Sequence, residues 1–114
     1  FHCALMQPAA DVMADALGDA DMHDAAVPVY CNVTAGPISA ADKLRENLLT
    51  QVTGRVRWRE TLGAVSASGV TCFVEIGTGK VLSGLVKRTL DEAVIVNLET
   101  ADDLDMVLQA IPTA

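Results

Sequence analysis

Apolar residues recur along the chain at two spacings, one typical of amphipathic helices and one typical of strands. The helical spacing predicts five helices, over residues 4–17, 40–52, 56–68, 80–90 and 101–111. Short β-branched runs predict three strands, over residues 27–33, 70–76 and 93–98. Because strands alternate with helices along most of the chain, we expect an α/β fold built on a parallel sheet.

Capping and turn residues mark several of these boundaries. Gly18 is expected to end the first helix, and Ser39 is expected to cap the second. Thr100 and Asp103 have the spacing of a capping box at the start of the last helix.

The composition fits one domain at most and excludes some functions. The chain has 114 residues, of which 51% are hydrophobic and only 4% aromatic, so its core must consist of small side chains. A net charge of -7 argues against general nucleic-acid binding, which needs clustered cations. All eight basic residues nevertheless lie within residues 43–88, where three glutamates leave a net charge of +5. That segment could face an acidic partner.

The cysteines and the start of the chain bear on its origin. Cys3, Cys31 and Cys72 are odd in number and widely spaced, which predicts buried thiols in a reducing, cytoplasmic setting. Neither a disulfide nor a metal site has a recognisable spacing, and no apolar run is long enough for a membrane span. Since Phe1 stands in place of an initiator Met, we expect the chain to be a piece of a longer protein.

The Gly77-Thr78-Gly79-Lys80 turn follows a strand that is apolar on both faces except for Glu75. Such a turn before a helix could bind phosphate through free backbone amides. A P-loop would need glycine in place of Val74 and Ser or Thr in place of Val81, and a dinucleotide fingerprint would need glycine in place of Leu82. The sequence therefore favours close packing of strand and helix over a nucleotide site.

His2 is the main candidate for chemistry, because it directly precedes the first predicted helix and an imidazole exchanges protons near neutral pH. The chain contains no Gly-x-Ser-x-Gly elbow to supply a nucleophile. Catalysis by this chain alone is therefore not expected.

Four groups of motifs run in register over nearly the whole chain: Phe1-His2-Cys3-Ala4-Leu5-Met6 with Pro8-Ala9-Ala10, Pro28-Val29 with Asn32-Val33, Gln51-Val52 with Val56-Arg57-Trp58, and Glu75-Ile76-Gly77-Thr78-Gly79-Lys80-Val81-Leu82-Ser83-Gly84-Leu85 with Lys87-Arg88. Together they resemble the C-terminal portion of the malonyl-CoA:acyl carrier protein transacylases of bacterial fatty acid synthesis. Thr78 departs from the family, which usually has proline there.

The resemblance implies that residues 1–114 form the C-terminal segment of the large domain of an α/β-hydrolase-like acyltransferase. The serine elbow, the malonyl-binding arginine, the oxyanion hole and a small ferredoxin-like subdomain would lie upstream. A serine would take malonyl from CoA and pass it to the phosphopantetheine thiol of acyl carrier protein, without a metal or further cofactor. His2 would be the catalytic base, oriented by the main-chain carbonyl of Gln51, and Phe1 would shape the acyl site.

Two alternatives stay open at this point. The chain could come from an acyltransferase domain of a polyketide or multidomain fatty acid synthase, or it could be a non-catalytic α/β module that binds an acidic partner through residues 43–88. In the transacylase interpretation we expect the isolated chain to be inactive and to expose an apolar sheet face where missing strands belong.

Overall fold

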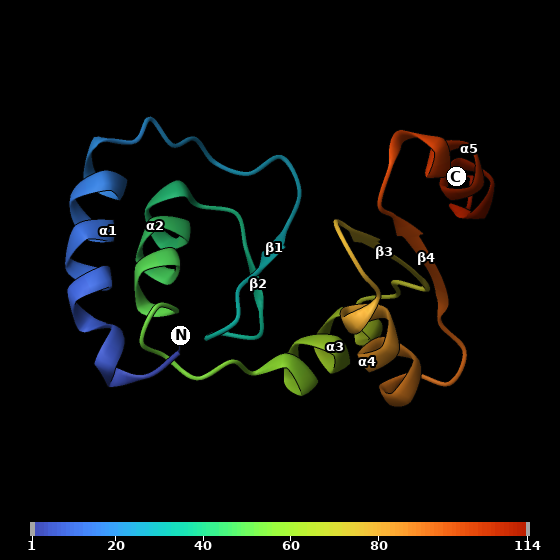
Figure 1. Cartoon of the computed structure of the whole chain (residues 1–114), viewed down its shortest axis with the longest axis horizontal. Coiled ribbons are helices and arrows are strands. Elements are labelled where there is room, and N and C mark those ends of the chain that lie inside the picture. Colours follow the sequence, from blue (N-terminus) through green and yellow to red (C-terminus); the bar gives the residue numbers. More distant parts are fainter. Residues whose placement is uncertain (1, 114) are drawn as a thin grey trace. The chain divides into compact units, whose positions relative to one another are not determined.

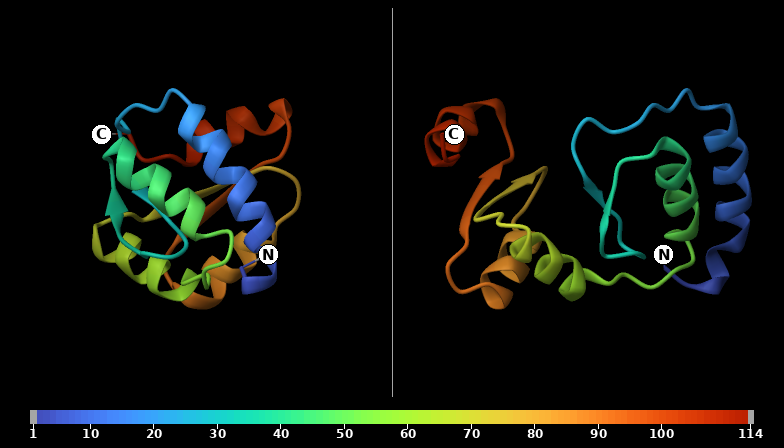
Figure 2. Two further views of the ribbon diagram at one scale, coloured as in Figure 1. Left: turned by 90° about the vertical axis from the view of Figure 1, so that its left-hand side faces the viewer. Right: turned by 180° about the vertical axis from the view of Figure 1, so that it is seen from behind.

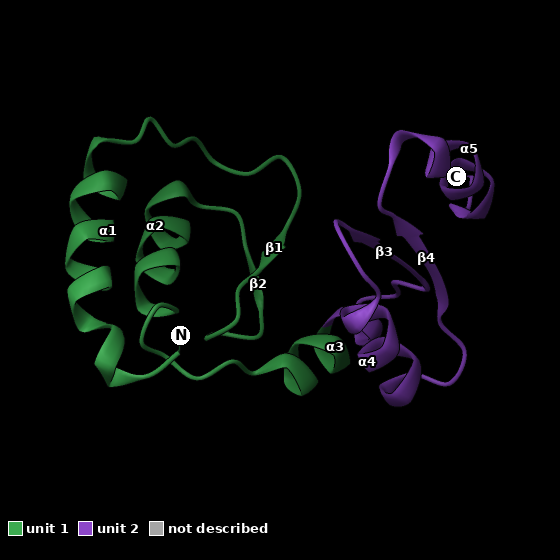
Figure 3. Ribbon diagram, viewed as in Figure 1, with its two compact units in different colours: residues 1–64 green, residues 65–114 purple. Residues whose placement is uncertain are grey.

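The computed structural model describes residues 2–113, and the chain divides into two compact units, residues 1–64 and 65–114 (Figure 3). The elements follow in this order (Figure 1): η1 (Ala4–Met6), α1 (Gln7–Asp19), β1 (Val29–Tyr30), β2 (Pro37–Ile38), α2 (Ala41–Thr50), α3 (Trp58–Ala67), β3 (Cys72–Ile76), α4 (Val81–Thr89), β4 (Val94–Leu98), η2 (Ala101–Asp103) and α5 (Leu104–Ala110). The boundary between the units falls within α3.

In the first unit α1 and α2 pack side by side, as Figure 2 shows from two further directions. Ala10 of α1 and Leu44 of α2 are buried. The guanidinium of Arg45 donates to the carbonyl oxygens of Leu17 at 2.7 Å and Ala20 at 3.0 Å. Because carbonyls at a helix C-terminus lack partners within the helix, Arg45 both satisfies the end of α1 and fastens it to α2.

The strand predicted over residues 27–33 is shorter than expected and does not belong to a parallel sheet. Only Val29–Tyr30 is extended as β1, and it pairs antiparallel with β2. Beyond it the chain turns, with the Ala35 amide donating to the Cys31 carbonyl at 3.1 Å and Ala35 at a φ of 53°. This turn draws the following residues out of the strand, which the β-branched composition could not reveal.

Helix ends differ from the prediction in two places. The predicted first helix is a 3-10 turn, η1, followed by α1, and it runs through Gly18 to Asp19. Ser39 does not cap α2; the carboxylate of Asp24 accepts from the Ala41 amide at 2.8 Å instead. A carboxylate seventeen residues earlier thus accepts the hydrogen bond that the Ser39 hydroxyl was expected to accept.

In the second unit β3 and β4 form the predicted parallel pair, with Cys72 opposite Val94 and Ile76 opposite Leu98. The connection through α4 contacts both strands, and α5 contacts β4. The capping box at the last helix is confirmed: the Asp103 carboxylate accepts from the Thr100 amide at 2.9 Å, ahead of η2 and α5. The parallel α/β arrangement is thus confirmed for residues 72–98.

The core is small and many apolar side chains are exposed. Leu62 and Val107 are the most deeply buried, at 2% and 3% exposure, and no described side chain is fully enclosed. Leu5, Ile76 and Val81 are 89%, 76% and 74% exposed. These three exposed side chains belong to η1, to the end of β3 and to the start of α4. In the described part of the chain, no helix is long and apolar enough to cross a membrane.

Candidate functional site

His2 lies against the C-terminal end of α2. Its ring Nδ1 is 2.7 Å from the main-chain carbonyl oxygen of Gln51. A carbonyl oxygen only accepts hydrogen bonds, so Nδ1 carries the hydrogen in this contact. In the neutral ring the proton acceptor is then Nε2, which is the arrangement that a general base needs when a fixed partner orients its other nitrogen.

The helix end explains why the Gln51 carbonyl is available to a ring from elsewhere in the chain. The Gln51 amide still donates to the carbonyl of Asn47 at 3.0 Å, so this residue completes the last turn of α2. The carbonyls of a last helical turn have no acceptor role within the helix. The Gln51 oxygen therefore points beyond the helix and meets His2.

The backbone of His2 is held at the same place. Its amide donates to the carbonyl oxygen of Val52 at 3.0 Å, and its φ is 62°. This left-handed conformation is uncommon for a residue with a side chain and persists only where the surroundings impose it. Two hydrogen bonds to successive carbonyls thus fix the ring and the backbone of His2 together. The part played by Val52 had no signal in the sequence.

The other two predicted site residues are Phe1 and Gln51. Phe1, the expected substrate-binding residue, lies outside the described residues. Gln51 is half-buried, and it is its main-chain oxygen that contacts His2. The site that the structure brings together is therefore His2 with the carbonyls of Gln51 and Val52.

A second polar cluster lies where β3 meets α4. The carboxylate of Glu75 accepts from the amides of Leu82 at 3.1 Å and Ser83 at 2.7 Å, from the Ser83 hydroxyl at 2.6 Å and from the Asn97 amide group at 3.2 Å. Asn97 also donates to the Ser83 hydroxyl at 2.7 Å. These donors, the Ser83 hydroxyl first, hold the pKa of Glu75 below its ordinary value.

The sequence indicated only one member of this cluster, Glu75, as a single charged residue in an otherwise apolar strand. The cluster bears on whether the turn before α4 could bind phosphate. Two amides at the start of α4 already donate to Glu75, and the Gly79 amide donates to the Glu99 carboxylate at 3.3 Å. Those amides are the groups that a phosphate would require. Gly77 and Gly79 have φ values of 128° and 88°, so the turn itself needs glycine at both positions.

The basic residues of the 43–88 segment are partly compensated within the chain. Lys43 pairs with Glu46 at 2.8 Å, and Arg55 and Arg57 both approach Glu60, at 3.8 and 3.3 Å. Ion pairs this exposed contribute little to stability, but they lower the charge that the segment presents to a partner.

The cysteines are all free, and one of them corrects the prediction. Cys31 is buried, and its burial raises its thiol pKa, while Cys72 is half-buried. Cys3, directly before η1, is exposed and not buried as predicted. In the part of the chain that the structure describes, no group of three or more His, Cys, Asp or Glu side chains could hold a metal ion.

Comparison with known proteins gives a consistent result, although no family model matches the chain. The chain is 41% identical over 105 residues to a malonyl CoA-acyl carrier protein transacylase from Synechocystis, which covers 92% of this chain and 36% of the relative. The corresponding protein from Bacillus subtilis is 37% identical over 111 residues, covering 97% of this chain and 35% of the relative. The chain matches the C-terminal part of malonyl-CoA:acyl carrier protein transacylases.

Solved transacylase structures confirm the fold class. The crystal structure of acyl-carrier-protein-S-malonyltransferase from Bartonella henselae superimposes with a TM-score of 0.90 at 43% identity, over 96% of this chain and 35% of that one. A malonyl-transacylase solved in complex with a type II PKS acyl-carrier protein gives a TM-score of 0.87 at 34% identity, over 96% of this chain and 36% of the other. The chain therefore has the α/β-hydrolase-like fold of this part of the transacylases and spans about a third of their length.

Proposed function

We propose that the chain supplies the catalytic histidine of a malonyl-CoA:acyl carrier protein transacylase of fatty acid synthesis, acting together with an upstream segment that carries the nucleophilic serine. The observation that carries this proposal is the 2.7 Å contact between His2 Nδ1 and the Gln51 carbonyl oxygen. It provides an oriented imidazole, and the similarity to the transacylases provides the reaction that such a ring would serve.

In the proposed reaction Nε2 of His2 takes the serine proton as the serine oxygen attacks the malonyl thioester carbon. The C–S bond then breaks, and the imidazolium returns the proton to the departing CoA thiolate. In the second half, Nε2 takes the proton of the carrier protein's thiol and the sulfur attacks the carbonyl carbon of the acyl-serine. The ester C–O bond then breaks, and the imidazolium returns the proton to the serine oxygen. Atoms and charges balance in each half without a metal or a further cofactor.

Two further residues have proposed roles. The Gln51 carbonyl fixes the tautomer of His2 as a carboxylate does in the Ser-His-Asp triad. Phe1 would fill the space that a 2-methyl group on the acyl chain requires, a discrimination of about 1–3 kcal/mol. The role of Gln51 rests on the resemblance and on its 2.7 Å contact with His2, and the role of Phe1 rests on the resemblance and on its place directly before His2 in the sequence.

The proposed partners follow from the same comparisons. A carrier protein was present in one of the matching transacylase structures, which supports acyl carrier protein as the acceptor. Three free cysteines suit the reducing cytoplasm, where we place the reaction. Residues 1–114 would belong to the large acyltransferase domain. Because that matching structure contains a polyketide-type carrier protein, an acyltransferase of polyketide synthesis is the second candidate.

The experiment is a malonyl-transfer assay on the full-length polypeptide that carries this chain, with radiolabelled malonyl-CoA and phosphopantetheinylated carrier protein. His2→Ala should lower the transfer rate by about 10²–10⁴-fold, the usual contribution of a general base. His23→Ala, at an exposed histidine of the loop after α1, is the matched control and should transfer at the wild-type rate. Wild-type transfer by His2→Ala would overturn the proposed function.

A further inference from the structure

The turn that presents the Gln51 carbonyl, residues 51–54, is tightly seated against another segment of the first unit. The Gly54 amide donates to the Thr50 carbonyl oxygen at 2.9 Å. A Cβ atom on Gly54 would lie only 2.7 Å from Cγ1 of Val33 and 2.8 Å from the Thr50 oxygen. Position 54 has no room for a side chain, because Gly54 packs directly against Val33. A displacement of Val33 would therefore displace the turn as well.

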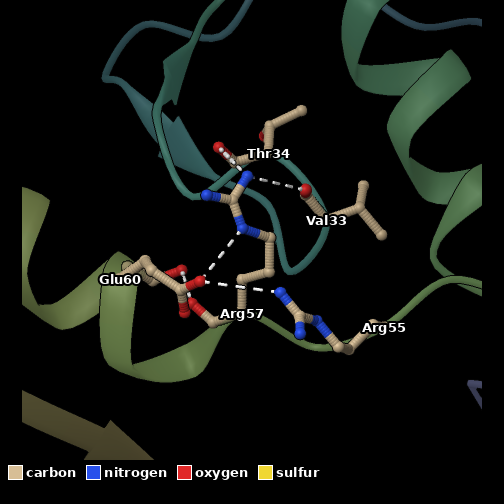
Figure 4. A network of polar contacts seen from close by, with 6 residues as sticks. Val33, Thr34, Arg55, Arg57 and Glu60 are labelled. Carbon is tan, nitrogen blue, oxygen red and sulfur yellow. Dashed lines mark hydrogen bonds and ion pairs between the residues drawn. The ribbon is translucent and has the colours of Figure 1, made fainter.

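Val33 itself belongs to a segment, residues 32–34, whose carbonyl oxygens face Arg57. The Arg57 amide donates to the Asn32 oxygen at 2.8 Å. The guanidinium Nη1 donates to the oxygens of Val33 at 3.5 Å and Thr34 at 3.4 Å (Figure 4). One arginine, standing directly before α3, therefore holds three successive carbonyls.

The guanidinium is fixed from its other side. Its Nε donates to the Glu60 carboxylate at 3.3 Å, one helical turn along, and Arg55 approaches the same oxygen at 3.8 Å (Figure 4). The Arg57 side chain is only 39% exposed. Hydrogen bonds from its own backbone amide and from Arg57 hold the pKa of Glu60 below its ordinary value, so Glu60 stays charged at neutral pH.

We propose that Arg57 is a positioning residue for His2. It acts through other residues: it holds residues 32–34, Val33 seats Gly54, and Gly54 belongs to the turn that carries the Gln51 oxygen. This inference rests on the proposed function for its catalytic consequence, and on geometry alone for its effect on the ring of His2.

A merely structural arginine would stabilise the fold without changing the proton position on His2. The tautomer of the ring is set by the hydrogen bond at Nδ1, so it reports directly on the Gln51 oxygen. Nitrogen-15 NMR of the imidazole distinguishes the two tautomers, and the His2 signals are identified by their loss in His2→Gln. The readout is independent of transfer activity.

The test compares Arg57→Met with Arg59→Met, at an exposed arginine two positions along and inside α3, in the full-length polypeptide. Arg57→Met should shift the His2 ring from the Nδ1–H form toward a mixture of both forms and lower kcat for malonyl transfer by about 10-fold or more, as small misplacements do. Arg59→Met should change neither. Arg57→Lys should recover only part of the effect, because an ammonium cannot span Glu60 and the carbonyls.

Two further variants keep the test decisive where Arg57→Met does not fold. Gly54→Ala should move the turn directly and give the same tautomer shift, and Glu60→Gln should give a smaller one. An unchanged tautomer in every folded variant overturns the positioning role. A shifted tautomer with wild-type malonyl transfer supports the positioning of His2 and overturns the proposed function instead.

Discussion

The turn that holds His2 and the cluster around Glu75 are both networks of hydrogen bonds, but they are built from different parts of the chain. His2, which is itself exposed, is held by the main-chain carbonyls of Gln51 and Val52. Glu75, in a half-buried position, is held by the side chains of Ser83 and Asn97 together with two main-chain amides. A substitution can remove a side-chain donor, whereas it leaves a carbonyl in place. We therefore expect side-chain substitutions to weaken the Glu75 cluster, and substitution of Gln51 to leave the contact with His2 in place.

Of the substitutions that test this comparison, we expect the largest loss of stability from one in the Glu75 cluster. Asn97→Ala removes two donors and leaves Glu75 and Ser83 short of partners within the sheet. We expect the free energy of unfolding to fall by about 1–3 kcal/mol, the usual consequence of leaving polar groups unsatisfied. Urea unfolding of the full-length polypeptide measures it, with the exposed Gln109→Ala as control. A loss no larger than that of the control would show that the cluster does not stabilise the sheet.

A smaller effect should follow from pH. The pKa of Glu75 is lowered in the folded chain, so its contribution to stability is complete above its ordinary value of 4.5 and is lost as pH falls through the folded value. The loss is partial, because a protonated carboxyl still accepts through its other oxygen. Unfolding measured from pH 7 down to pH 3 should show a shallower decline in Glu75→Gln than in the wild type, and parallel curves would contradict this.

The smallest effect is expected at Gln51. Gln51→Ala keeps the carbonyl that contacts His2 and preserves the helical conformation at the end of α2. We expect stability to change by less than about 0.5 kcal/mol and malonyl transfer by less than about threefold. Steady-state kinetics beside His2→Ala checks it. A loss comparable to that of His2→Ala would mean that the amide side chain acts, and the contrast between the two regions would fail.

The sequence was most informative where local pattern decides the structure. The apolar runs of β3 and β4 and the capping box at Thr100 were predicted because each has its signal within its own few residues. The prediction that Ser39 caps α2 was wrong, because the carboxylate of Asp24, from the loop after α1, accepts from the first amide of that helix. The early end of β1 depends on the left-handed turn at Ala35, an alanine with no signal for that conformation.

The candidate site was predictable only in part and for a related reason. His2 could be identified from its place before a helix and from the resemblance. The role of Gln51 came from the resemblance alone, because every residue has a carbonyl and its use leaves no trace in composition. Arg57 was part of a quoted motif, but its contacts to residues 32–34 are tertiary and became visible only in the structure.

The central claim is tested most directly by the coupling between the His2 ring and the Gln51 carbonyl across their hydrogen bond. The full-length polypeptide would be labelled with nitrogen-15 in histidine and carbon-13 at the Gln51 carbonyl. Because His2 Nδ1 is 2.7 Å from the Gln51 carbonyl oxygen, we predict a protonated Nδ1 with a measurable scalar coupling to the carbon of that carbonyl. An unprotonated Nδ1 with no coupling would contradict the account of how this chain holds its base.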